Sequence, residues 1–186
     1  MENNNQQNYQ NNQSQGYKDP IIQKLIDVLE ESGPAELKGR YHHGDVMVPA
    51  KSDLPMVSIS RDRTRITQAS DLEDDNSMPL VINVLYDYTR DLTNDWNVQA
   101  GITSLYRLME QRSPDNFGLM EGTIAHVLRT KQQLAPKLWL AVGPNEVVDI
   151  DYGLGIERRG PGIFSVEAVA RVTARVHSPR PGVPTV

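Results

Sequence analysis

The sequence contains no cysteine. Disulfide bonds, thiolate metal sites and cysteine nucleophiles are therefore excluded, and this usage fits a reducing cytoplasm. No apolar run approaches the ~18 residues that a membrane span needs. The N-terminus lacks both the basic start and the apolar stretch of a signal peptide. A net charge of −5 offers no general attraction to nucleic acid or to an anionic membrane, so we expect no membrane partner.

Hydrophobic residues are also scarce, at 38% of 186 residues, and the shortage is greatest at the N-terminus. Residues 1–15 include eleven Asn or Gln, and such a segment buries too little apolar surface to offset the entropy of ordering it. We expect a flexible Asn/Gln-rich arm over residues 1–18, a single domain over 19–178 and an extended proline-rich tail over 179–186. Two interpretations of the arm stay open: a disordered tail, or a tether that becomes ordered on a neighbouring subunit.

Helical periodicity predicts three helices. The first begins at Asp19-Pro20, an N-cap followed by a proline, and ends at Gly33. The second begins after Asn94 or Asp95 and ends at Ser113, and the third covers about residues 118–131. Residues 61–78 are expected to form a long polar loop.

Alternation of apolar residues predicts strands over 55–60, 79–89, 137–142, 147–157 and 163–177. The turn signal Arg159-Gly160-Pro161-Gly162 joins the last two into a hairpin with one buried face. The element order predicts an α+β fold: a mainly antiparallel sheet with helices packed on one face and a long C-terminal β-hairpin.

Charged residues form two groups that we interpret as a subunit interface. In the expected 61–78 loop, alternating arginines share one face and are followed by acids, so that opposite charges of neighbouring subunits could meet. In the hairpin, aspartates of one strand are expected close to arginines of the other. The candidate interface residues are Arg61, Arg63, Arg65, Asp71, Glu73, Asp74, Asp75, Asp149, Asp151, Arg171 and Arg175.

The segment Tyr41–Asp45 contains two imidazoles, His42 and His43, and the carboxylate of Asp45. A zinc or iron site needs at least three ligands in fixed geometry, and adjacent residues of an extended chain point to opposite sides. The sequence has no phosphate-binding loop, Gly-x-Ser-x-Gly or His-Glu-x-x-His motif. We therefore expect no enzyme, catalytic residue, cofactor or metal. The alternative is a metal-binding enzyme or a monomeric interaction module that uses this segment.

Several small motifs follow the first helix in a characteristic order: Gly39-Arg40-Tyr41, Gly44-Asp45, Val48-Pro49 and Leu54-Pro55-Met56-Val57-Ser58-Ile59. This order resembles the opening of tail-terminator and related neck (head–tail connector) proteins of tailed bacterial viruses. The arm and the 61–78 segment depart from the compact pattern of that family, and they leave a terminator and another neck component as alternatives.

The resemblance implies a virion structural protein, assembled in the host cytoplasm, whose hexameric ring caps the tail tube and joins it to the head. It implies copies of itself, tail-tube proteins and head-completion or connector proteins as partners. DNA is expected to pass through without specific binding, and the family has no catalytic residues to transfer to this chain.

Overall fold

The computed structural model describes residues 18–44, 46, 49–70, 72–91, 98–141, 148–153, 155–179 and 181. Within them the chain has an α+β fold, with three α-helices and a nine-stranded, mixed and mostly antiparallel sheet. The predictions for the arm and for most of the C-terminal tail lie outside the described residues. The helices are α1 (Pro20–Ser32), α2 (Val98–Glu110) and α3 (Ile124–Thr130).

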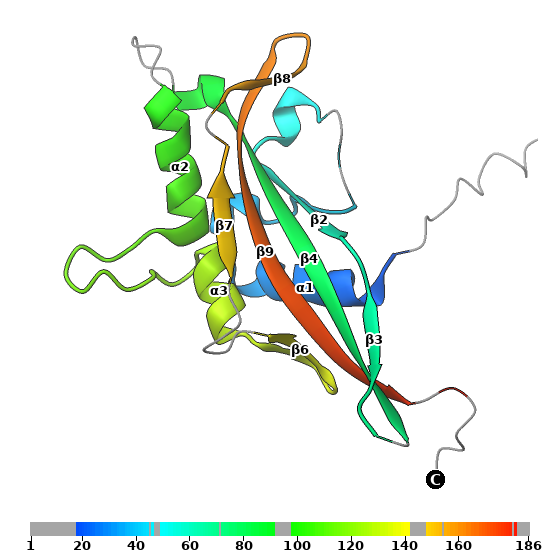
Figure 1. The fold of residues 1–186 in the computed structure, drawn as a ribbon. Helices are drawn as coiled ribbons and strands as arrows, with labels where there is room; N and C mark the ends of the chain where they lie inside the picture. The colour runs from blue at the N-terminus through cyan, green and yellow to red at the C-terminus, as the bar shows by residue number, and fades with distance from the viewer. Residues whose placement is uncertain are drawn as a thin grey trace, which may run out of the picture.

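The strands are β1 (Tyr41–His43), β2 (Met56–Arg61), β3 (Arg65–Gln68), β4 (Glu73–Asp87), β5 (Gln133–Ala135), β6 (Leu138–Ala141), β7 (Asp149–Tyr152), β8 (Glu157–Gly160) and β9 (Ile163–Pro179). Their order across the sheet is β1-β2-β4-β9-β6-β5. Strand β3 also pairs with β4, and β7 and β8 also pair with β9. The long antiparallel pair of β4 and β9 is therefore the spine of the sheet (Figure 1).

All three helices contribute to one core on one face of this sheet. The apolar stripe of α1 is buried there through Ile22, Leu25, Ile26 and Leu29, as its helical spacing predicts. Fully burying one such side chain contributes roughly 1.5–3 kcal/mol. The sheet residues of the core alternate along their strands, which confirms the predicted buried faces of β4 and β9: Val57, Ile59, Leu80, Ile82, Val84, Tyr86, Val166, Ala168, Ala170, Val172 and Ala174.

The helix boundaries follow local chemistry. The Asp19 carboxylate accepts a hydrogen bond from the backbone N–H of Ile21 at 2.9 Å, and Pro20 occupies the first helical position. Thr123 caps α3 by accepting from the backbone N–H of His126 at 3.3 Å. Helix α3 therefore begins at residue 124 and not near 118, because the six preceding residues form a turn that ends at this cap.

Two other predictions are wrong. Residues 61–78 are not a long loop, because most of them form the end of β2, all of β3 and the start of β4. The strand expected over residues 147–157 is instead the two short strands β7 and β8, which pair with successive parts of β9. The first error arises because the polar residues of these strands carry no apolar alternation. The second arises because the apolar alternation continues past Tyr152, where β7 ends, and so does not mark the break before β8.

Candidate assembly surface

The face of the sheet opposite the three α-helices is largely polar, since those helices all pack into the core on the other face. Its residues alternate with those of the core, so β4 and β9 present their odd-numbered side chains there. A small second apolar cluster, Leu54, Met56 and Leu85, covers one end of this face. The remaining positions, which we call the open face, include Ser77, Pro79, Val81, Asn83, Val169, Arg171, Thr173 and Arg175.

The three alternating arginines do not share one face, which corrects the prediction from their spacing. Arg61 pairs with Leu80 in the register of β2 and β4, whereas Arg65 pairs with Ser77 in the register of β3 and β4. The register changes by one residue between the two strands, and a slip of one residue exchanges the faces of a strand. Arg61 therefore lies on the helix face, and Arg65 lies on the open face.

Arg61 forms an ion pair with Asp19, the N-cap of α1. The side chain of Asp19 is only 10% exposed and that of Arg61 30%, and Arg61 also donates to Thr64 Oγ1 at 3.2 Å. This arginine links β2 to the start of α1, so its structural partner is inside the subunit.

Arg63 and Arg65 are exposed and make no ion pair with any described residue. They line a hollow of about 520 Å³ together with Ser77, Pro79 and Thr173 of the spine strands. We call this the arginine hollow. Its two guanidinium groups and two hydroxyl groups are hydrogen-bond donors of the kind that bind oxygen-bearing anions.

Two of the acidic residues that follow, Glu73 and Asp75, are strand residues with partners inside the subunit. Lys137 Nζ donates to Glu73 Oε1 at 2.7 Å, and this hydrogen bond, with the lysine charge, lowers the pKa of Glu73 below its usual value. Asp75 Oδ1 lies 3.7 Å from His177 Nε2. Asp74 is half-buried on β4, and Asp71 lies outside the described residues.

The charges of the C-terminal hairpin meet only in part. Asp151 forms an ion pair with Arg171, and Asp149 lies directly opposite Arg171 in the β7–β9 register. Arg175 instead lies opposite Trp139 of β6 and Ser77 of β4. The prediction that both aspartates approach Arg175 is wrong, because β7 ends before this part of β9 and β6 takes its place.

Sequence reasoning missed the projecting turns. The structure exposes seven large hydrophobic side chains among the described residues, and six of them lie in or near three projecting turns. These are Ile66 of β3 and Leu72 of the β3–β4 turn, Phe117 and Met120 between α2 and α3, and Ile156 just before β8 and Phe164 near the start of β9. The signal available in the sequence was an apolar residue within a polar turn segment, as at Phe117 after Pro114-Asp115-Asn116.

The turn between α2 and α3, residues 111–123, is a projection with an ordered backbone. Residues 112 and 119 form a β-bridge, the backbone N–H of Ser113 donates to the carbonyl of Gly118 at 2.9 Å, and that of Phe117 donates to the carbonyl of Ser113 at 3.0 Å. Phe117 is left-handed, with φ of 57°, and 74% exposed. This conformation costs an L-residue about 1–2 kcal/mol, which the surrounding hydrogen bonds must offset.

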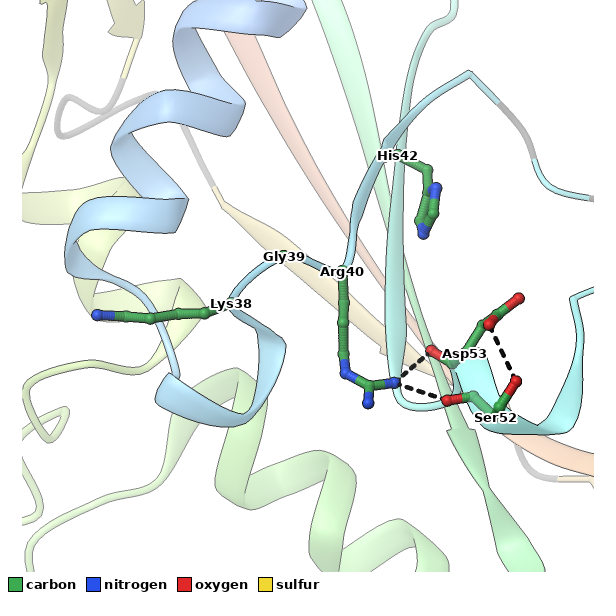
Figure 2. A pocket seen from close by; sticks show the side chains of 6 residues that line it. All are labelled: Lys38, Gly39, Arg40, His42, Ser52 and Asp53. Carbon is green, nitrogen blue, oxygen red and sulfur yellow. Dashed lines mark hydrogen bonds between the residues drawn. The ribbon is translucent and has the colours of Figure 1, made fainter.

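The Tyr41–Asp45 segment borders a polar pocket of about 340 Å³, lined by Lys38, Gly39, Arg40, His42, Ser52 and Asp53. Figure 2 shows Arg40 reaching the backbone of Ser52 and Asp53, whereas Lys38 points away from them. His43 lies elsewhere, with Nε2 3.2 Å from the carbonyl of Asp19. Asp45 is outside the described residues, which contain no group of three or more potential metal ligands.

Arg40 holds together the motifs that carry the family resemblance. One of its terminal nitrogens donates to the carbonyls of residues 52, 53, 54 and 55, at 3.1, 2.8, 3.3 and 3.5 Å. The backbone N–H of Gly39 donates to the Glu30 carboxylate at 2.9 Å. Burial of Tyr41, and then the charge of Glu30, raise the pKa of the Tyr41 phenol above its usual value. The Gly-Arg-aromatic segment thus positions the chain that enters β2.

A scan against protein-family models finds no match, and a search of curated proteins finds no relative. No helix within the described residues combines the length and the apolar character needed to cross a membrane.

Proposed function

We propose that this chain is a non-catalytic structural subunit that assembles into a ring, of the tail-terminator type found in the neck of tailed bacterial viruses. The observation that carries the proposal is the concentration of exposed apolar side chains at three projecting turns. Apolar groups on projecting turns gain from burial in a partner, and three separate turns fit a subunit that contacts several neighbours. A hexamer is the expected ring, and tail-tube and head-completion or connector proteins are the expected neighbours.

The sheet supports assembly in a second way. Within the described residues, β3 and β5 each pair with only one neighbouring strand, so each leaves one edge of backbone N–H and C=O groups without a strand partner. Strand edges of this kind are sites at which another chain adds to a sheet. All four side chains of β3 are exposed, so this edge is accessible.

The family resemblance gains physical support from the contacts of Arg40. Its hydrogen bonds to the carbonyls of Leu54 and Pro55 join the Gly-Arg-aromatic and Leu-Pro motifs. Motifs that form one structural unit are better grounds for a shared fold than motifs that lie apart. A net charge of −5 also suits a ring through which DNA passes without specific binding.

Two measurements test the proposal. Light scattering after size exclusion should give the mass of a closed oligomer, and electron microscopy should show rings with a central channel. When the tail-tube protein of the same genome polymerises in vitro, added ring should stop tube growth and shorten the tubes. A monomer at every concentration, with no effect on tube length, would refute the ring and favour a monomeric interaction module. Bound metal that is lost on His42→Ala would favour the metal-binding alternative.

A further inference from the structure

The arginine hollow and the 111–123 projection lie on opposite sides of the molecule. Figure 1 shows the projection extending away from α2 and α3 on one side, and β3 on the far side of the spine strands. The two features differ in shape and in charge, because one is a hollow with two arginines and the other is a projecting turn with an exposed carboxylate.

The projection carries two side chains that match the hollow. Asp115 is exposed and forms no ion pair with a described residue, and Phe117 is the most exposed large hydrophobic side chain among those residues. The hydrogen bonds within the turn fix the backbone that carries both side chains before any partner arrives. An interface anchor that is ordered in advance loses little conformational entropy on binding.

The hollow offers a counterpart to each side chain. Arg63 and Arg65 supply guanidinium groups that can pair with a carboxylate, and Pro79 supplies an apolar wall. An aromatic ring that enters beside a guanidinium group also gains a cation–π contact. Ser77 and Thr173 supply hydroxyl groups for the remaining carboxylate oxygen.

We propose that the projection of one subunit inserts into the arginine hollow of the next, with Asp115 paired to Arg63 and Arg65 and with Phe117 packed against Pro79. The inference rests on the proposed ring function and identifies its subunit contact. The two surfaces are different and lie on opposite sides, so the contact is heterologous. Contacts of this type repeat from copy to copy and close into a ring when the rotation between copies is right.

A second copy fits the hollow better than nucleic acid does. The subunit is acidic overall, with a net charge of −5, and Glu73 and Asp75 lie farther along the same strand as Ser77. A long polyanion lying on this face would meet those carboxylates. The Asp115 carboxylate, one short side chain on a turn, would meet only the two arginines.

The test uses the full-length protein and measures the protein concentration at which half of the subunits are assembled, for the wild type and for each variant. The charge reversals Asp115→Lys and Arg65→Glu should each raise this concentration at least about tenfold, because a like-charge contact then replaces an ion pair. The paired reversal in one chain should recover most of the loss. Glu31→Lys and Arg129→Glu, which make the same charge changes at exposed positions elsewhere, should leave assembly unchanged.

Mixing two defective variants gives a sharper result. Phe117→Asp retains the hollow, and the double variant Arg63→Glu/Arg65→Glu retains the projection. Together they should form a one-to-one dimer and nothing larger, since only one intact contact is left between them. Circular dichroism and thermal melting of each variant check that it is folded. If a charge-reversal variant does not fold, the neutral variants Asp115→Asn and Arg65→Gln are used in its place.

Three outcomes would overturn the inference. If the wild type forms rings and the reversals assemble as the controls do, the inference fails and the proposed function stands. If the wild type stays monomeric, the ring function fails and the contact fails with it. If Arg63→Glu/Arg65→Glu assembles normally but loses binding to a labelled DNA duplex, the hollow holds phosphates instead.

Discussion

Replacing Arg61 with methionine should lower the stability of the subunit and not merely its assembly. Methionine keeps an aliphatic stem in contact with the sheet and removes the charge. The Asp19 carboxylate then loses its ion-pair partner in a site where its side chain is 10% exposed. Breaking a fully buried ion pair costs about 3–5 kcal/mol. Because the side chain of Arg61 is 30% exposed, we expect the free energy of unfolding to fall by about 2 kcal/mol.

A double-mutant cycle separates the ion pair from the helix cap. Asp19→Asn removes the carboxylate charge but keeps an N-cap of comparable quality for α1. Residues in one ion pair have a coupling energy of 0.5–3 kcal/mol, and we expect about 1–2 kcal/mol here. Urea unfolding followed by far-UV circular dichroism, at one fixed protein concentration, gives the four free energies.

Arg129→Met is the matched control, because Arg129 is exposed, makes no ion pair with a described residue and lies outside the proposed subunit contact. Its effect should stay within about 0.5 kcal/mol. An Arg61→Met variant that unfolds like this control, or a coupling energy near zero, would show that Arg61 does not hold α1. Arg61 would then return to the set of interface candidates.

Three further predictions concern the core, a glycine and a surface ion pair. Leu105→Ala, at a fully buried position of α2, should lower the free energy of unfolding by about 2–5 kcal/mol. Gly33→Ala should lower it by about 1–3 kcal/mol, because the added methyl group would lie 2.5 Å from the carbonyl oxygen of Leu29; thermal melting checks both. Lys137 lowers the pKa of Glu73 in the folded protein. This pair therefore stabilises the folded state at a pH above the usual carboxyl pKa, and the stabilisation is lost as the pH falls through the lowered pKa of Glu73. Lys137→Met should raise the pKa of Glu73 in an NMR titration, and an unchanged value would refute the contact.

The fold class could be predicted from the sequence because the helical stripe and the strand alternation that indicate it are each set by residues close together in the chain. The stripe Ile22, Leu25, Ile26 and Leu29 and the alternation along residues 80–88 each mark a face that must leave water. The proline and the N-cap before the first helix are also local signals, and the helix begins where they predict. Helices on one face of a mainly antiparallel sheet follow from the order of these elements.

The register of the polar strands depended on tertiary structure. Residues 61–78 have no apolar alternation, so nothing in the sequence marked the one-residue slip that places Arg61 beside α1 and Arg65 on the open face. Hydrogen bonds between backbones align these strands whatever their side chains are. For the same reason the sequence could not show that Arg175 lies beside β6 and not beside β7.

The sequence by itself determined the buried stripe of the first helix and the buried faces of the two long strands. The tertiary structure decided which charges are tied within the subunit, as Arg61 and Glu73 are, and which remain available to a partner, as Arg63, Arg65 and Asp115 are. The physical reason is the range of the two interactions. Burial of a stripe is set by neighbours in sequence, whereas an ion pair depends on chain segments brought within a few ångströms by the whole fold.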